Sequence, residues 1–373
     1  MAKPVREVAP PLPYAGPVTP AELSRTVRRA VCRAVEDDVL PGPVPERVTV
    51  ERSRPGGRGD YASNVALRLA GPAGRPPREI AEILRSRVDT TRGIARVEIT
   101  GPGFLNFTLG RDGRAGLVRT ILGDPARYGH GDALAGTAVA FAPPPGGDPR
   151  ARLWTDTVVR LLRGQGAEAA VVPGAAERLT VVPAGIGPDG LLARLGHDAA
   201  HWALLRPAAH DRPYTGPDLL VQRESNALFR VRYAHARARA LVRNAAHLGI
   251  PSRYTGPDPY PGTRPGPSHD PYGAGLPGRD GTARAAAALL TALGDHPAVL
   301  EAAARLRAPD RLARHLEHTA EAFLRFQEIC RPLPLGDEKP SAAHSSGTAL
   351  AEAAGAVLAG GLSLLGIDAP EHL

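Results

Sequence analysis

Several residue types that support common functions are scarce or missing in this chain. No methionine follows Met1, and no lysine lies between Lys3 and Lys339. A phosphate-binding P-loop requires an internal lysine, so that class of nucleotide-binding protein is excluded. The two cysteines, Cys32 and Cys330, are far apart in the sequence and lack the paired spacing of metal ligands. This spacing excludes a cysteine zinc cluster and a framework of several disulfides.

Aromatic residues and long apolar runs are also scarce. Aromatic residues make up 4% of the 373 residues and hydrophobic residues 43%, so the cores must consist mainly of leucine, alanine and valine. No apolar run approaches the ~20 residues of a membrane-spanning helix. The N-terminus lacks the apolar segment of a signal peptide. We therefore expect a cytoplasmic protein.

Basic residues outnumber acidic ones, 46 to 38, which gives a formal net charge of +8. Nearly all of the basic residues are arginine, whose guanidinium group pairs with phosphate and stacks on bases. The excess of positive charge favours a polyanionic partner, most simply nucleic acid. A GC-rich genome explains part of the arginine and alanine content, but it does not explain the excess of bases over acids.

The sequence predicts a multidomain α+β protein. The five prolines of residues 1–18 predict a flexible tail, and residues 19–132 predict a small α+β domain. Residues 133–196 predict a truncated Rossmann-like α/β remnant, because a complete doubly wound domain needs about 150 residues or more. Residues 197–373 have helical periodicity. Within them, residues 251–282 hold eight prolines and seven glycines and predict a long exposed loop.

Hydrophobic periodicity and turn residues also predict individual elements. The prediction comprises a helix from Thr19, a strand over 48–50, a helix over 61–69, a helix from Pro76, strands over 97–100 and 104–109, a strand over 137–142, a helix over 153–162 and a strand over 169–172.

Ordered motifs resemble bacterial arginyl-tRNA synthetases. Residues 59–67 (GDYASNVAL), 75–81 (RPPREIA) and 101–107 (GPGFLNF) resemble the N-terminal additional domain of that family. Residues 198–200 and 233–237 (YAHAR) resemble its helical DALR anticodon-binding domain. The motifs follow the order of the family, and the chain as a whole resembles the shortened, synthetase-related anticodon-binding proteins of high-GC actinobacteria.

The chain departs from this family at both ATP-binding signatures. The resemblance places the first, His-x-Gly-His, on Pro145, Gly146, Gly147 and Asp148, where both histidines are absent and an acid would repel phosphate. It places the second, Met-Ser-Lys, on residues whose context is strand-like: Arg178, Leu179 and Thr180. The resemblance therefore implies a pseudoenzyme that has no catalytic residue and uses neither a metal nor a cofactor.

The resemblance implies two RNA-binding surfaces. In the N-terminal domain an aromatic residue and an asparagine that read a flipped base of the tRNA elbow match Phe104 and Asn106. Strand alternation places these two on one face and Leu105 and Phe107 on the other, which favours an exposed Phe104 and Asn106. The alternative is that Phe104 belongs to the core and Asn106 caps a turn.

The second surface is predicted on a helix over residues 226–247. Val231, His235, Ala238 and Val242 share its apolar stripe, and His235 is expected to be a core histidine. The RNA-binding stripe consists of Asn226, Arg230, Tyr233 and Arg237. In the family this helix faces the anticodon loop, and the C-terminal Leu373 stands where the family often ends in methionine near the anticodon. The alternative is a solvated basic face with Tyr233 packed in the core.

Three functions follow from these observations. The favoured one is a non-catalytic, tRNA-binding relative of arginyl-tRNA synthetase that contacts the tRNA elbow and the anticodon loop, with arginine tRNA as the first candidate. A scaffold or regulatory protein that binds a protein partner, such as a synthetase, is the alternative. A residual arginine-tRNA ligase or arginyl-transfer activity is the third.

Overall fold

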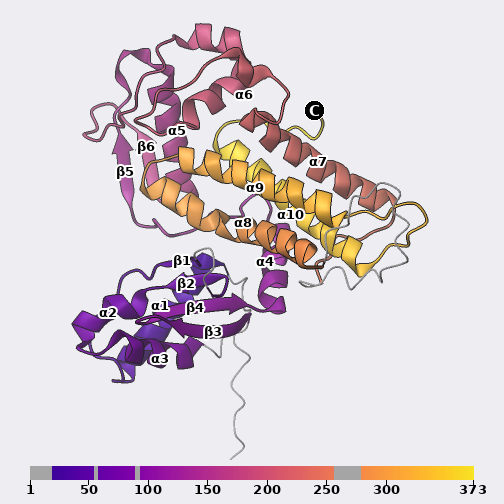
Figure 1. Cartoon of the computed structure of the whole chain (residues 1–373). Helices are drawn as coiled ribbons and strands as arrows, with labels where there is room; N and C mark the ends of the chain where they lie inside the picture. Colours follow the sequence, from indigo (N-terminus) through magenta and orange to yellow (C-terminus); the bar gives the residue numbers. More distant parts are fainter. Residues whose placement is uncertain (1–18, 54–57, 89–92, 256–278) are drawn as a thin grey trace, which may run out of the picture.

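The computed structural model describes residues 19–53, 58–88, 93–255 and 279–373. The predicted tail over residues 1–18 and most of the predicted loop over residues 251–282 lie outside the described residues. Figure 1 shows a small N-terminal α+β unit beneath a larger, mostly helical body.

The N-terminal unit is an antiparallel sheet with helices packed against it. Its strands lie in the order β1-β2-β4-β3. Its own core includes Leu23, Tyr61 and Phe107 and is separate from the core of the larger body. The elements are α1 (Pro20–Glu36), β1 (Val50–Arg52), β2 (Tyr61–Ser63), α2 (Val65–Ala73), α3 (Pro77–Val88), β3 (Ile94–Thr100) and β4 (Phe104–Leu109).

The structure corrects the predicted helix over residues 61–69. Tyr61 and Ser63 are buried on one face of β2, which pairs with both β1 and β4. The helix α2 begins only at Val65, after Asn64. The apolar residues from Tyr61 to Leu69 keep a helical spacing, so the sequence pattern alone does not separate the strand from the helix. The strand is identified by its pairing with β1 and β4.

A single β-α-β unit follows the N-terminal unit. The helix α4 (Arg111–Gly123) leads into β5 (Ala138–Phe141), α5 (Pro149–Gly164) and β6 (Glu168–Val171), and β5 pairs with β6 in parallel. These elements match the predicted strand-helix-strand pattern within a few residues. Their buried side chains, and those of α4, join the helical core, so the remnant has no core of its own.

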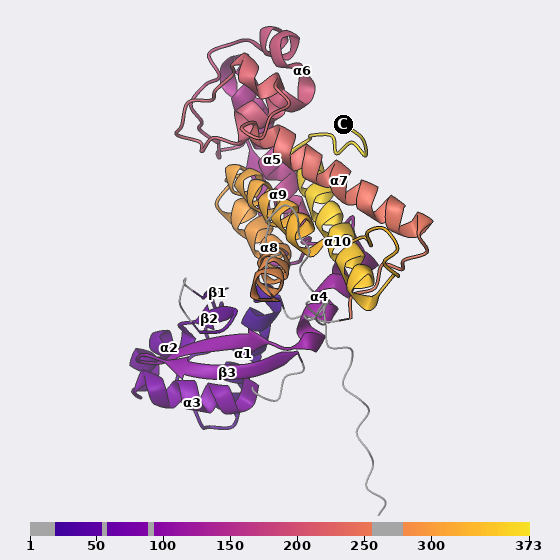
Figure 2. The same cartoon turned by 45° about the vertical axis from the view of Figure 1, so that its right-hand side comes forward.

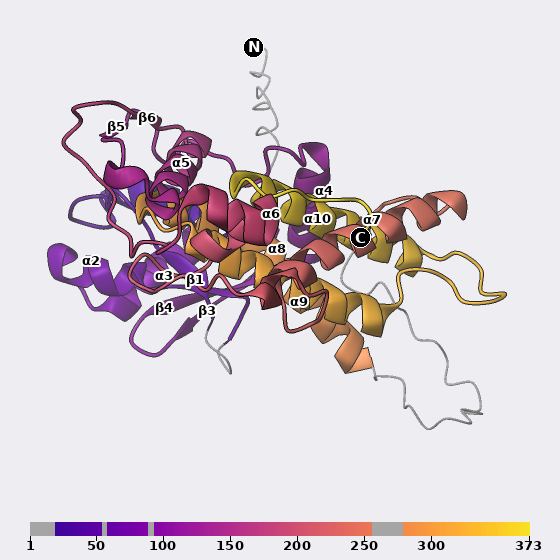
Figure 3. The same ribbon diagram turned by 90° about the horizontal axis from the view of Figure 1, so that it is seen from above.

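The rest of the chain forms a helical body (Figures 2 and 3). The helix α6 begins at Pro188, before the predicted boundary at 197, but a break at Gly196, which has φ 68° and ψ 179°, separates its first two turns from the rest. The helix α8 begins at Arg279, so the last four residues of the predicted loop are helical. The elements are α6 (Pro188–Leu205), η2 (Pro217–Leu220), α7 (Ala227–His247), α8 (Arg279–Arg305), α9 (Asp310–Cys330) and α10 (Ala342–Leu364).

The helix α10 corrects the expectation that no apolar segment approaches the length of a membrane-spanning helix. It is long and apolar enough to cross a membrane by length and composition, but 67% of its most apolar window is buried inside the protein. It packs against α7, α9 and α8, so its apolar residues are explained by the core of the bundle.

The helix α8 joins the two bodies through polar contacts. The hydroxyl of buried Tyr61 on β2 donates a hydrogen bond to Asp295, and Arg47 forms an ion pair with Glu301. A Cβ atom at Gly294 would lie 3.0 Å from the Tyr61 hydroxyl, so a larger residue there would crowd this contact. The joint is not closed by a continuous core, because a cavity of about 890 Å³ remains between β1, α8 and the start of α9.

A proline inside α8 creates a second contact at this joint. Pro297 has no N–H group, so the carbonyl of Leu293 cannot accept the usual i→i−4 helical hydrogen bond. The Tyr128 hydroxyl donates to that carbonyl at 2.8 Å, and its ring stacks on buried His296. The segment after α4 therefore satisfies a backbone group that the helix alone leaves without a partner.

We predict that Tyr128→Phe lowers the free energy of unfolding by about 1–3 kcal/mol, because the Leu293 carbonyl loses its donor. The midpoint of urea denaturation, followed by circular dichroism, measures this loss. Tyr214→Phe is the matched control, since it removes an exposed hydroxyl that bonds Asp218. It should change stability by no more than about 0.5 kcal/mol. Equal effects of the two variants would contradict the role of Tyr128.

Candidate nucleic-acid interface

The turn between β3 and β4 presents Phe104 to solvent. Phe104 is 40% exposed, whereas Leu105 and Phe107 are fully buried in the core of the N-terminal unit. The alternation that the sequence predicted for this strand is therefore correct for these three residues. An exposed phenylalanine ring at the start of a strand offers a flat surface on which a base can stack.

Asn106 does not share the exposure of Phe104, and its predicted position on an exposed face was wrong. Asn106 is only 6% exposed. Its side-chain amide donates to the Thr100 hydroxyl at 2.8 Å and to the carbonyls of Phe104 and Glu98 at 3.2 Å and 3.3 Å. These acceptors surround the 101–103 turn. The residue therefore ties the hairpin together, which agrees with the alternative reading of a turn cap.

The solvent side of α7 carries a pair of aromatic rings. Tyr233 is 41% exposed, so it is not packed in the core. The ring of Phe229, one helical turn earlier, lies 5.8 Å from it at an interplanar angle of 22°. Sequence reasoning missed Phe229, although its spacing of four residues from Tyr233 places both on one helix face. Two neighbouring rings form a platform that suits unpaired bases.

Arginines flank this aromatic pair. Arg230 is partly exposed and has no ion pair among the described residues. Arg237 is also partly exposed, and its Nε atom donates to Gln327 of α9 at 2.9 Å. Arg232 forms an ion pair with Asp198 at 3.5 Å. The predicted residues Arg230, Tyr233 and Arg237 are therefore all at least partly exposed, and their spacing of three and four residues puts them on one side of α7.

Asn226 lies at the end of the predicted stripe but is not available as predicted. It is only 8% exposed and caps the start of α7, where its side-chain oxygen accepts from the backbone N–H of Phe229 at 3.3 Å. Its amide donates to the carbonyls of Leu219 and Val221 at 2.8 Å and 2.9 Å. Asparagine is a favoured N-cap residue, so this role follows from local helix chemistry.

The opposite side of α7 is buried, as the sequence predicted for Val231, His235 and Ala238, while Val242 is only partly buried. The imidazole of His235 contacts the carbonyl of Pro370 at 3.0 Å, and burial lowers its pKa. His235 is therefore a core histidine that holds the C-terminal segment. Leu373, at the end of this segment, is 51% exposed.

The segment that was expected to hold the first ATP-binding signature lies at the N-terminus of α5. Pro145, Gly146 and Gly147 form the short helix η1, and Asp148 is the N-cap of α5. One carboxylate oxygen of Asp148 accepts from the backbone N–H of Ala151 at 2.9 Å, and the other accepts from that of Ala184 at 3.0 Å. The carboxylate occupies the Ala151 donor, which is of the kind that holds phosphates at helix N-termini, and its charge repels phosphate.

The segment that was expected to hold the second ATP-binding signature does not form the strand that its sequence suggested. Arg178, Leu179 and Thr180 have no regular secondary structure, and Arg178 and Thr180 are exposed. Leu179 packs against the large core. The strand-like pattern has no pairing partner here beyond an isolated bridge between Phe141 and Glu177. The predicted strand was wrong because apolar alternation alone does not supply a neighbouring strand.

Sequence reasoning missed a buried arginine at the same helix N-terminus. Arg150 is fully buried, and burial lowers its pKa. A cation in a first helical turn is unfavourable, which could have marked this position as unusual. Its guanidinium donates at 2.7–3.1 Å to five backbone carbonyls, those of Val182, Leu204, Pro207, Ala208 and Asp211. Every N–H of the guanidinium group therefore serves the fold.

The opposite environments of Phe104 and Asn106 give a prediction. Asn106→Ala should lower the free energy of unfolding by about 1–3 kcal/mol, because it removes buried hydrogen bonds. Phe104→Ala should change stability by no more than about 0.5 kcal/mol, since the ring is largely exposed. Urea denaturation measures both. Unchanged stability of Asn106→Ala together with a loss of RNA affinity would restore the base-reading role instead.

Two protein families match parts of the chain. The family described as "Arginyl tRNA synthetase N terminal domain" matches residues 21–109, and the family described as "DALR anticodon binding domain" matches residues 231–373. The first covers the sheet and helices around Phe104, and the second covers most of α7 and all of α8 to α10.

Curated relatives extend the comparison along the chain. The chain is 26% identical to the arginine–tRNA ligase of Frankia alni and 24% identical to that of Pseudarthrobacter chlorophenolicus, over 95% of this chain and 100% of each relative. It is 41% identical to the arginine–tRNA ligase of Renibacterium salmoninarum over 40% of this chain and 29% of that relative. The first two alignments span 571 positions, but the chain has 373 residues, so at least 198 positions hold a residue of the relative alone.

Solved structures share the fold at low identity. The arginyl-tRNA synthetase of Thermus thermophilus superposes with a TM-score of 0.63 at 13% identity, over 94% of this chain and 100% of that chain. The arginyl-tRNA synthetase of Plasmodium falciparum gives 0.62 at 9% identity, over 96% and 100%. The chain thus has an arginyl-tRNA synthetase-like fold, with an N-terminal domain of that type and a DALR anticodon-binding domain.

Proposed function

We propose that this chain is a cytoplasmic, non-catalytic tRNA-binding protein that contacts the tRNA elbow through its N-terminal domain and the anticodon loop through α7. Arginine tRNA is the first candidate, because the curated relatives are arginine–tRNA ligases. The DALR domain supports tRNA binding, and the exposed rings of Phe104 and Tyr233 support these two places of contact.

The aromatic pair on α7 carries the RNA-binding part of the proposal. Phe229 and Tyr233 lie next to each other on the solvent side of a helix inside the matched DALR region or directly before it. Arg230 and Arg237 stand beside them and offer guanidinium groups to phosphates. The chain as a whole carries a net charge of +8, which adds long-range attraction for an RNA.

The Asp148 carboxylate carries the non-catalytic part. It accepts from the backbone N–H of Ala151 in the first turn of α5 and from that of Ala184, at the position to which the resemblance assigns the first ATP-binding signature. No lysine lies near the second signature position, so the charge that develops on transferring phosphates would have no lysine to neutralise it. The 198 or more alignment positions without a residue of this chain agree with a reduced catalytic region.

Tyr233→Ala should weaken tRNA binding by about fivefold to one-hundredfold, because stacking contributes about 1–3 kcal/mol per base. Filter binding with tRNA from the same organism measures the dissociation constant over a series of salt concentrations, and affinity should fall steeply with salt. Tyr233→Phe is the matched control, since it keeps the ring and should keep the affinity. Equal affinities of the alanine variant and the wild type would contradict a stacking role.

The purified protein should show no arginine-dependent exchange between pyrophosphate and ATP, because neither ATP-binding signature is present. Exchange of labelled pyrophosphate, with and without tRNA, measures this activity, and a full arginine–tRNA ligase serves as the positive control. Exchange above the no-enzyme background would overturn the non-catalytic part and would leave the RNA-binding part intact.

A further inference from the structure

The C-terminal segment lies beside α7 (Figure 2), where it contacts His235, Arg239 and Arg243. Two hydrogen-bonding contacts, both separate from the arginines of α7, fix the position of this segment. The Pro370 carbonyl contacts the buried His235 imidazole at 3.0 Å, and the Asp368 backbone N–H donates to Asp198 at 3.2 Å. The path of the segment is therefore set before residue 371 is reached.

Glu371 then pairs with two arginines of α7. Its Oε1 atom accepts from Nε and Nη2 of Arg239 at 3.0 Å and 2.7 Å, and its Oε2 atom accepts from Arg243 at 3.4 Å. The side chains of Arg239, Arg243 and Glu371 are 40%, 34% and 50% exposed. The hydrogen bond to Arg239 and the charges of both arginines lower the pKa of Glu371, so it is ionised at neutral pH.

These arginines belong to the same helix as Tyr233. At a rise of 1.5 Å and a turn of about 100° per residue, Arg239 lies about 9 Å further along the α7 axis and about 120° around it, and Arg243 about 15 Å further and about 80° around it. A nucleic-acid strand whose bases stack on Tyr233 can thus place neighbouring phosphates near one or both guanidinium groups. A carboxylate and a phosphate use the same donors of an arginine, so Glu371 occupies the position that a phosphate oxygen would take.

The Glu371 contact is weak enough to be exchanged. Ion pairs between exposed side chains contribute about 0–1 kcal/mol, because water screens the charges and the side chains lose freedom. An RNA phosphate brings counterion release in addition to its charge, which a protein carboxylate does not. Displacement of Glu371 by RNA is therefore favourable, but breaking the ion pairs of Glu371 reduces the binding free energy that RNA gains from the two arginines.

We propose that Glu371 is an internal competitor for RNA, which masks Arg239 and Arg243 and lowers the affinity of the α7 surface until a phosphate displaces it. The proposal rests on the proposed function and concerns the regulation of that same surface. It gives a role to the pairing of two α7 arginines with the side-chain carboxylate of Glu371.

Filter binding of tRNA to full-length Glu371→Gln tests the proposal. We expect the dissociation constant at low salt to fall by about threefold to tenfold, and the dependence of log affinity on log salt to steepen by about 0.7 for each arginine that gains a phosphate. Glutamine keeps the size of the side chain, and the contacts of Asp368 and Pro370 do not involve it. Circular dichroism and thermal melting check that the variant is folded.

Glu328→Gln is the matched control. Glu328 is an exposed residue of α9 with no ion pair among the described residues, and its substitution changes the net charge by the same amount. It should leave affinity nearly unchanged. Adding Arg239→Gln and Arg243→Gln to Glu371→Gln should abolish the gain.

The other outcomes count against the proposal in distinct ways. An equal gain in Glu328→Gln would assign the effect to net charge, and a loss of affinity in Glu371→Gln would make the segment a support for RNA binding; either result overturns the proposal. Absence of binding by the wild type and by every variant would overturn the proposed function itself. Binding by Glu371→Gln but not by the wild type would show complete masking.

Discussion

The arrangement of the two candidate RNA-binding surfaces depends on the joint at the middle of α8. Tyr61 reaches Asp295 from the N-terminal sheet, and Tyr128 supplies the hydrogen-bond donor that Pro297 removes from the Leu293 carbonyl. Because the N-terminal unit has its own hydrophobic core, few apolar contacts fix its orientation.

Burial at this joint changes the chemistry of its titratable groups. Burial raises the pKa of Asp295 to about 6, although the Tyr61 hydroxyl stabilises the ionised form. Burial also lowers the pKa of His315, which stacks on His296, to about 4, so its imidazole is neutral at pH 7. The joint thus keeps uncharged histidines inside and one partly buried carboxylate at the boundary. A polar joint of this kind fixes geometry without adding much apolar burial.

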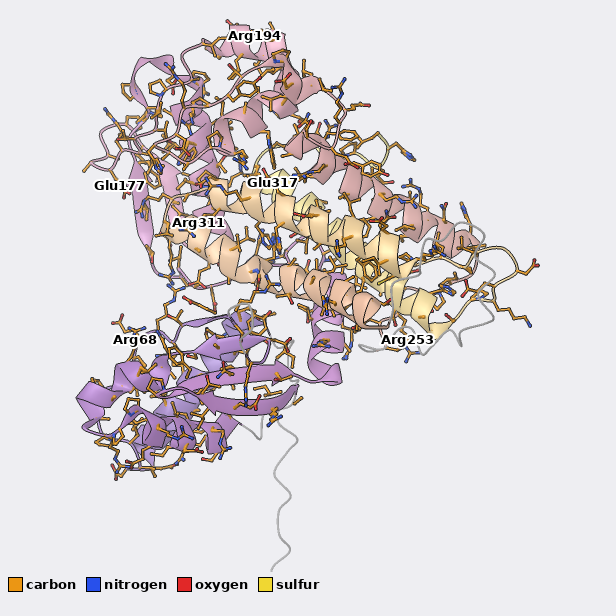
Figure 4. The ribbon with its side chains drawn as sticks, viewed as in Figure 1. Arg68, Glu177, Arg194, Arg253, Arg311 and Glu317 are labelled. Carbon is orange, nitrogen blue, oxygen red and sulfur yellow. The ribbon has the colours of Figure 1, made fainter. Side chains whose placement is uncertain are left out.

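The α5 N-terminus and the α7 surface differ in how far the fold itself occupies their polar side chains. At α5 an aspartate and a fully buried arginine use their hydrogen-bonding groups on the backbone, and little remains for a ligand. At α7 the aromatic rings and several guanidinium groups remain partly exposed. Two further arginines of α7, Arg239 and Arg243, form ion pairs with Glu371, so partly exposed guanidinium groups still find a partner within the chain. Figure 4 draws the side chains and labels several arginines and glutamates.

Local patterns determined much of this protein. They gave the multidomain α+β class, the buried Leu105 and Phe107 and the core role of His235, because periodicity and residue identity act over a few neighbouring positions. Only the tertiary structure decided that Asn106 and Asn226 turn inward, that Tyr61 belongs to a strand and that Glu371 covers Arg239. These outcomes depend on partners that lie far away in the chain, and an asparagine or a glutamate bonds whichever partner the fold brings within reach.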